Sequence, residues 1–269
     1  MDKHVEDYYL NPLGKGMLGQ FHKTIALNEA LDLDWETVHK MAPNLPKGWY
    51  ELSCLSLKDR IEFTQDFWQS KLPFRHHFFQ FIDHFFSSLD DIGIFLTQKN
   101  YDAPFQVEMV YSLKDNRGFY RGKPPITEMN LSHLKKDFSS INLPTDYIAF
   151  LQIHDGFCKA TDCTGITASC DMKGSYDYFQ KMMERDEPLT TGKGSLVNPK
   201  SLIPFYESFG MPFYQCFFSE WYPEQEMGNV YYSAESHTIS ELSKRGSNSL
   251  EMTFTAFLDW LKFYLESVT

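Results

Sequence analysis

The sequence predicts an α+β fold, with a helical N-terminal region followed by a mostly antiparallel sheet flanked by helices. Apolar residues recur at helical spacing before residue 90, and short strand-like runs dominate the remainder. Separate blocks of helices and strands are typical of this fold class. Hydrophobic residues make up 42% of the chain and charged residues 23%, which is the composition of a globular protein rather than a disordered one.

The first expected helix covers residues 17–31, where apolar side chains follow one another at three- and four-residue steps. Asp34 is a candidate N-cap for a short second helix that runs through His39. The sequence PNLPKG, residues 43–48, then interrupts the helical pattern, because proline and glycine disfavour helix interiors.

Two stronger helices are expected next. Ser56 and Asp59 form a capping-box-like start for a helix over residues 57–72, which Pro73 ends. Its apolar side is expected to hold Leu57, Ile61, Thr64, Phe67, Trp68 and Leu72. A helix over residues 74–87 has an apolar face too broad for a surface helix, which predicts burial. That face consists of Phe74, Phe78, Phe81, Ile82, Phe85 and Phe86.

The pattern changes to strands after Asp91. Residues 92–98 are expected to form one strand, and residues 105–122 a β-hairpin around the turn sequence KDNRG. The stretch GKPPITE, residues 122–128, is the expected boundary between an N-terminal region (1–122) and a C-terminal domain (125–269). If the two halves share one sheet, this stretch is only a loop.

The C-terminal half begins with a weak helix over residues 130–139. A second helix is expected to start at Thr145 or Asp146 and to be stopped by Gly156, which can adopt the left-handed conformation. The remaining expected elements are a strand at 166–172, a helix at 175–187, strands in SLIPFYES, FYQCFFSEWY and NVYYSA, and a closing aromatic helix at 253–268.

Several short motifs follow one another in a defined order after residue 140. They are Leu143-Pro144 before Tyr147, Phe150 and Leu151; the stop His154-Asp155-Gly156-Phe157; the strand Leu202-Ile203-Pro204-Phe205; the strand start Gly228, Val230, Tyr231 and Tyr232; and Phe254, Phe257 and Leu258 in the last helix. This order resembles the SUKH superfamily (Smi/Knr-like domains), although the stop departs from the usual Asn-Gly-Gly. The resemblance implies a protein-binding fold of regulators and toxin-immunity proteins, and it carries over no active-site residue.

The net charge restricts the class of binding partner, and the hydropathy pattern restricts the cellular location. The formal net charge of −11 disfavours a general nucleic-acid-binding face and favours a basic protein partner, either a toxin or a regulatory protein. The chain contains no run of about 18 apolar residues, so we expect no membrane span. The polar start MDKHVEDYYL lacks the apolar core of a signal peptide, and the five cysteines show no framework spacing. We therefore expect a cytoplasmic protein with reduced thiols.

The candidate contact residues lie mainly in one segment, residues 219–226, between two expected strands. Tryptophan and tyrosine provide binding area at low entropic cost, and carboxylates attract a cationic partner. The predicted protein-binding residues are Asp155, Glu220, Trp221, Tyr222, Glu224 and Glu226. The alternative for Trp221 is a place in the core, the usual environment of this side chain.

A metal- or thiol-dependent enzyme is the alternative function. His154, Cys158, Cys163 and Cys170 could in principle hold zinc, or Cys158 could act as a nucleophile beside His154. The spacing lacks a C-x2-C knuckle. The sequence TGKGS at 191–195 does not match a phosphate-binding loop, because a glycine follows the lysine. We therefore predict no catalytic residue, metal or cofactor. A purely structural subunit that packs on sister chains is a third possibility, and the oligomeric state is left open.

Overall fold

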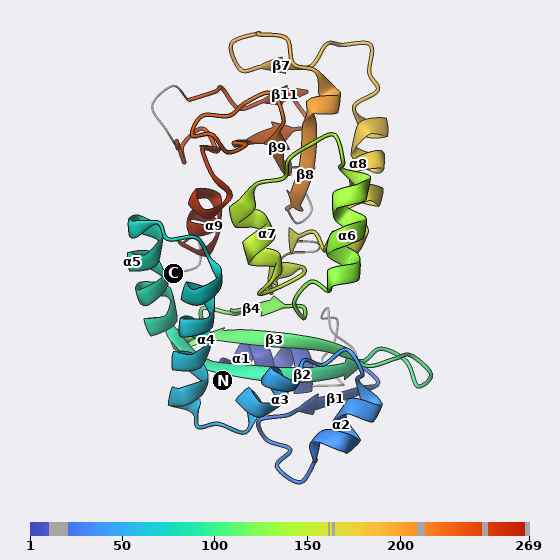
Figure 1. Cartoon of the computed structure of the whole chain (residues 1–269), viewed down its shortest axis with the longest axis vertical. Helices are drawn as coiled ribbons and strands as arrows, with labels where there is room; N and C mark the ends of the chain where they lie inside the picture. Colours follow the sequence, from blue (N-terminus) through green and yellow to red (C-terminus); the bar gives the residue numbers. More distant parts are fainter. Residues whose placement is uncertain (11–20, 161, 163–164, 209–212, 244–246, 267–269) are drawn as a thin grey trace. The chain divides into compact units, whose positions relative to one another are not determined.

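The computed structural model in Figure 1 describes residues 1–10, 21–160, 162, 165–208, 213–243 and 247–266. The chain forms two compact units. The first comprises Met1–Lys71 and Phe79–Pro124, and the second comprises Leu72–Phe78 and Pro125–Ser267. Both units combine helices with mostly antiparallel strands, so the predicted α+β class is confirmed. The division into two independent domains stays a prediction.

The first unit contains four antiparallel strands (Figure 1). Their order is β1 (Lys23–Ala26), β2 (Leu89–Gln98), β3 (Gln106–Leu113) and β4 (Phe119–Gly122). A 3-10 turn, Lys114–Asn116, joins β3 to β4, so the predicted hairpin is confirmed.

The predicted helix over residues 17–31 is wrong where the structure describes it. Residues 23–26 form a strand, in which Ile25 pairs with Leu96 of β2. Residues 17–20 lie outside the described part of the chain. The β-branched side chains Thr24 and Ile25 suit an extended backbone, and the edge of β2 supplies the hydrogen-bond partners that a local pattern does not reveal.

Two helices of the first unit, α2 (Trp35–Met41) and α4 (Leu57–Lys71), begin where capping residues predict them. Asp34 accepts a hydrogen bond from the Thr37 backbone N–H at 2.8 Å, and Ser56 donates to the Asp59 carboxylate at 2.7 Å. Both predicted starts are confirmed. The helices are α1 (Lys3–Val5), a π-helical turn (Glu6–Leu10), α2, α3 (Lys47–Ser53), α4 and α5 (His76–Ser87), whose residues up to Phe78 belong to the second unit. Helices α1 and α3 and the π-helical turn were not predicted.

The buried faces of α4 and α5 differ in part from the expected ones. The central α5 residues are buried as predicted, whereas Phe74 precedes the helix and is 73% exposed. On α4, Trp68 is buried and donates to the Tyr111 hydroxyl at 3.0 Å, but Leu57 is exposed. Arg60 is buried instead, because the Asp91 carboxylate neutralises its guanidinium at 2.7 Å.

The strands of the second unit are hydrogen-bonded to one another in the order β5-β6-β8-β9-β10-β11-β7, and β12 also pairs with β10. Among the described pairings of this unit, only β11 with β7 is parallel. The strands are β5 (Phe157–Lys159), β6 (Gly165–Ile166), β7 (Thr190–Thr191), β8 (Leu202–Glu207), β9 (Phe213–Phe218), β10 (Asn229–Ser233), β11 (Thr238–Ile239) and β12 (Thr253–Phe254). The three predicted strands correspond to β8, β9 and β10. A short 3-10 helix, Pro199–Ser201, precedes β8.

Four helices belong to the described part of the second unit: α6 (Glu128–Asp137), α7 (Thr145–Leu151), α8 (Ser169–Met182) and α9 (Phe257–Glu266). Helix α7 begins at Thr145 as predicted. It ends at Leu151, before Gly156, which does adopt a positive φ of 106°. Helix α9 starts later than expected, because residues 253–254 pair with β10.

The strand predicted at residues 166–172 is wrong, since α8 already begins at Ser169. The Asp155 carboxylate accepts hydrogen bonds from the Ser169 backbone N–H and from its hydroxyl, both at 2.6 Å. An anionic acceptor at a helix N-terminus satisfies an otherwise unpaired donor and favours the helix. This acceptor lies 14 residues back in the chain, so local periodicity could not indicate it.

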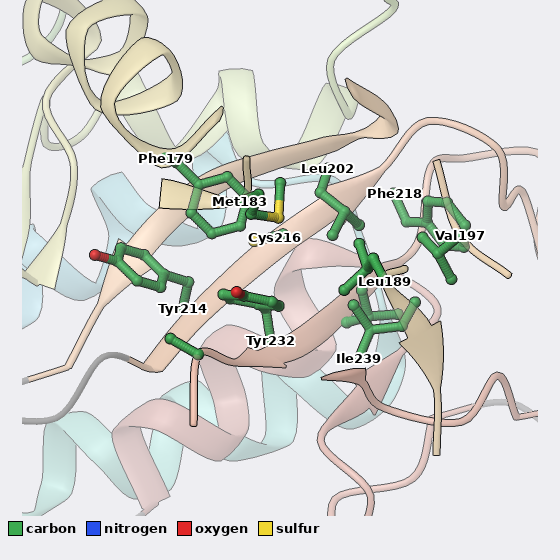
Figure 2. Close-up of a cluster of buried hydrophobic side chains, with 12 residues drawn as sticks. Phe179, Met183, Leu189, Val197, Leu202, Tyr214, Cys216, Phe218, Tyr232 and Ile239 are labelled. Atoms are coloured by element: carbon green, nitrogen blue, oxygen red, sulfur yellow. The ribbon is translucent and has the colours of Figure 1, made fainter. Parts of the chain in front are cut away.

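Alternate residues of β9 point to opposite faces of the sheet. On one face Tyr214, Cys216 and Phe218 join the apolar cluster of Figure 2, which includes Phe179 and Met183 from α8 and its C-terminal end. On the other face Phe217 contacts aromatic rings of α7 and α9. The strands of this unit are therefore buried between α8 on one side and α7 with α9 on the other.

Candidate functional site

The segment joining β9 to β10, residues 219–226, is here called the acidic–aromatic loop. Trp221 is half-buried and packs against the apolar cluster of Figure 2. Its backbone N–H donates to Phe218 at 2.9 Å, and its carbonyl accepts from Gly228 at 3.0 Å. A Cβ atom at Gly228 would come within 2.3 Å of the indole ring, so glycine is needed for this close approach.

The three carboxylates of the loop contact other segments of the second unit. Glu226 accepts hydrogen bonds from Thr145 at the start of α7, and Glu220 accepts one from Asn198 at 3.2 Å. Glu224 lies 3.4 Å from the Arg75 guanidinium and accepts from the Thr255 hydroxyl at 3.2 Å. These contacts attach the loop at several points to the rest of the second unit.

Tyr222 is the loop aromatic most available to a partner, because 48% of its surface is exposed. Glu220 and Glu224 are also exposed. Two exposed carboxylates therefore flank the exposed ring in the sequence, while Trp221 packs on the core. The ring of Trp221 packs on the core and is partly accessible, and its role in partner binding stays a prediction.

Asp155 does not belong to this loop. It follows α7, is buried, and has both carboxylate oxygens engaged by Ser169. Its role in partner binding stays a prediction, while the contacts that it makes position the start of α8.

A pocket of about 180 Å³ lies in the second unit, on the face of β9 that carries Gln215 and near α9. The sequence did not indicate it, because its walls come from six separate segments. Most of its lining residues are aromatic. They are Lys159, Tyr206, Ser208, Phe213, Tyr214, Gln215, Tyr231, Met252, Trp260, Phe263 and Tyr264.

A buried carboxylate, Asp162, connects three lining residues on one side of the pocket. It accepts hydrogen bonds from the hydroxyls of Tyr264 and Tyr206 and from the Lys159 backbone N–H. The Lys159 ammonium lies 4.5 Å from the centre of the Tyr264 ring. Burial lowers the pKa of Lys159, and the Asp162 charge opposes this shift. Burial, reinforced by the same charge, raises the pKa of Tyr206 and Tyr264, so both phenols stay neutral.

The comparisons with known proteins support the fold described above. A model of the SMI1/KNR4 family (SUKH-1) matches residues 125–261, which is half of the chain. The chain belongs to the SMI1/KNR4 family. The matched residues, called the SUKH domain below, contain both the acidic–aromatic loop and most of the pocket walls. Compared with curated proteins, the chain shows no significant match.

The alternative metal or thiol site falls within the SUKH domain. His154 is fully buried, with its ring against Phe150 and Phe157. Cys170 is exposed at the start of α8, and Cys163 lies outside the described residues. Among the residues that the structure describes, no group of three or more His, Cys, Asp or Glu side chains could hold a metal ion.

In the described part of the chain, no helix combines the length and the apolar character that crossing a bilayer requires.

Proposed function

We propose that the SUKH domain is a nonenzymatic protein-binding module, and that the acidic–aromatic loop forms part of its contact surface. The observation that supports this most is the exposed ring of Tyr222 on a loop whose carboxylates accept hydrogen bonds from other segments of the same unit. Ordering a flexible loop costs free energy during association, so a loop held in advance binds more tightly for the same contacts. Membership of the SMI1/KNR4 family is compatible with such a role.

The chemistry of the loop favours a cationic partner. Glu220 and Glu224 flank the exposed ring, and the whole chain carries a net charge of −11. Complementary charge accelerates association, and this acceleration falls as salt increases. The proposed partner is a basic protein, either a toxin that the module neutralises by occlusion or a regulatory protein. A cytoplasmic location belongs to the same proposal.

Capture experiments test the proposal. The full chain and a Tyr222→Ala, Glu220→Gln double variant are immobilised and exposed to a lysate, and the retained proteins are identified. Tyr178→Ala is the matched control, because this tyrosine is also exposed (66%) but lies on α8. A partner retained by the wild type and the control, and lost with the double variant, supports the proposal.

Purified partner then allows a quantitative test. We expect the loop variant to weaken binding about tenfold or more, as truncation of an interface aromatic commonly does. Binding should also weaken with increasing salt. Equal affinity of the loop variant and the wild type would reject the loop as the contact surface.

A further inference from the structure

His237 is a buried histidine in the turn between β10 and β11. It is 4% exposed, and its backbone has a positive φ of 50°. This left-handed conformation costs free energy for a residue other than glycine, and it persists only where surrounding contacts hold it. The contacts of the imidazole ring therefore decide whether the turn keeps its shape.

One of these contacts is a hydrogen bond with a buried phenol. The Tyr232 hydroxyl and the His237 Nδ1 atom are 3.1 Å apart. Tyr232 is fully buried in the apolar cluster of Figure 2, and in the described part of the chain this nitrogen is the only hydrogen-bond partner of its hydroxyl. Burial raises the pKa of Tyr232, so the phenol keeps its proton and can donate it to a neutral imidazole.

The ring also contacts the segment between α8 and β7. The backbone of Glu187 forms a hydrogen bond with the His237 ring. A carbonyl can only accept, so the ring supplies the proton of this bond. A neutral imidazole has one N–H donor and one acceptor nitrogen, and it therefore satisfies Glu187 and Tyr232 together.

Protonation of the ring breaks this arrangement. Both nitrogens of an imidazolium donate, so the Tyr232 hydroxyl must turn its hydrogen away from His237 and into apolar surroundings. A buried donor without an acceptor costs free energy, and a buried charge that is poorly compensated costs more.

The charged groups around the ring favour its neutral form. Burial and the positive charge of Arg185 lower the pKa of His237 below its ordinary value of 6.5, whereas the hydrogen bond and the charge of Glu187 oppose this shift. From β9, Cys216 acts on Tyr232, but burial raises the pKa of its thiol, which adds no charge near neutral pH. The closed turn thus holds an uncharged His237.

His237 and Glu187 precede the two strands at one edge of the sheet. β11 begins at Thr238 and β7 at Thr190, and these strands pair in parallel over two residues. β7 is the last strand in the order of the described strands. So short a parallel ladder has few hydrogen bonds of its own, which makes the neighbouring contact through His237 important for keeping it closed.

We propose that His237 is an acid-sensitive switch for this edge of the sheet. Its neutral ring holds the β10–β11 turn to the segment before β7, and protonation releases them so that the edge opens. Above about pH 6.5 neither form binds a proton and the edge stays closed. Below that value the open form binds a proton that the closed form does not, so opening increases as pH falls toward the lowered pKa of the closed form. The switch acts within the SUKH domain, whether or not the acidic–aromatic loop binds a partner.

An NMR titration of the full chain tests the protonation step. Imidazole signals are followed from about pH 7.5 to about pH 4.5, and the signal that is missing in His237→Asn identifies His237. We expect its pKa to lie below 6.5. Arg185→Gln removes a repelling charge at an exposed position and should move this pKa upward. The matched control is Lys181→Gln, which removes an exposed positive charge from α8 that is not among the groups acting on the ring, and it should leave the pKa unchanged.

Hydrogen exchange of the same protein measures the opening. The Gly192 N–H donates to the Ile239 carbonyl at 3.2 Å and reports on the β7–β11 edge. The Leu27 N–H, which donates to the Ile94 carbonyl at 2.9 Å in the first unit, is the internal control. After correction for intrinsic exchange, opening at Gly192 should increase several-fold between about pH 7 and about pH 5, by at most about tenfold per pH unit, and opening at Leu27 should not. In His237→Asn the opening at Gly192 should not depend on pH.

Three results would each overturn the switch: a His237 pKa at or above 6.5, opening at Gly192 that does not change with pH, or the same pH dependence in His237→Asn. If His237→Asn does not fold, Arg185→Gln replaces it. Its raised pKa should reduce the effect of acid on opening at Gly192, and an undiminished effect would contradict the role of His237.

Discussion

Glu226 caps helix α7 by accepting two hydrogen bonds from Thr145, a residue 81 positions earlier in the chain. One carboxylate oxygen lies 2.7 Å from the Thr145 hydroxyl, and the other lies 3.3 Å from its backbone N–H. The acidic–aromatic loop is thereby attached to the start of a core helix. A residue predicted only as a contact for a partner also has a structural role.

Replacing Glu226 by alanine should therefore lower stability. The variant loses the cap and the favourable charge at the helix N-terminus, which together contribute about 1 kcal/mol to the free energy of unfolding. Urea denaturation measures this difference. The matched control is Glu235→Ala, an exposed residue between β10 and β11, which should change stability by less than about 0.5 kcal/mol. Equal effects of the two changes would contradict the capping role.

The contact between Gly228 and Trp221 predicts a second stability effect. Gly228→Ala would place a methyl group 2.3 Å from the indole ring, so Trp221 or the backbone must move, at a cost of about 1–3 kcal/mol. Gly174→Ala is the control. It lies on α8 with no atom within 4 Å of the added Cβ, and it should raise stability by about 0.5–1 kcal/mol. Thermal melts of both variants should shift in opposite directions, and a Gly228→Ala protein as stable as the wild type would show that Trp221 is not fixed there.

Asp146 should give the stability of the folded protein an unusual pH dependence. Its carboxylate accepts from the Leu258 N–H at 3.0 Å, but burial outweighs this bond and raises the pKa above 3.8. The folded protein then holds a proton that the unfolded chain releases, so the stabilising contribution of Asp146 increases as pH falls through the raised pKa. The stability of the wild type relative to Asp146→Asn should therefore increase toward low pH.

Asp34 provides a control, because its contribution to stability should change with pH in the opposite direction. The Thr37 N–H at the start of α2 lowers its pKa, so its contribution is present above 3.8 and is lost as pH falls through the lowered value. Urea denaturation of the wild type, Asp146→Asn and Asp34→Asn between about pH 7 and about pH 3 measures both trends. The same pH trend for the two positions would contradict the assignment for Asp146.

Thiol reactivity tests the core shown in Figure 2. Cys216 is fully buried, and burial raises the pKa of its thiol well above 9.0. The thiolate is the reactive form, so alkylation of Cys216 in the folded protein should be far slower than that of the exposed Cys54 and Cys170. Peptide mass mapping after a short treatment measures this directly. Modification of Cys216 at the rate of Cys54 would show that the cluster opens readily.

Local patterns predicted the elements whose signals lie within a few residues. The caps at Asp34 and Ser56, the hairpin 105–122 and the start of α7 were all identified correctly. Errors occurred where a distant residue decides the structure. The start of α8 depends on Asp155, and the buried Arg60 on α4 depends on Asp91, 31 positions later.

In the candidate site, too, local features could be predicted from the sequence and long-range contacts could not. The acidic–aromatic loop was visible as a continuous sequence, but the intramolecular partners of its carboxylates were not, because Thr145, Asn198 and Arg75 are far away in the chain. The pocket could not be predicted at all. Its walls include Tyr206 from β8, Tyr231 from β10 and Trp260 from α9, which only the folded sheet brings together.

The central claim is that a partner protein contacts the acidic–aromatic loop. Site-specific photocrosslinking measures this contact most directly: a photoreactive amino acid replaces Tyr222 in one full-length variant and Tyr178 in another, and irradiated cell lysates are analysed by mass spectrometry. We predict a discrete crosslinked partner, rich in Lys and Arg, at position 222 and none at position 178. The same products at both positions, or none at position 222 while a partner is still captured by the full chain, would contradict the account.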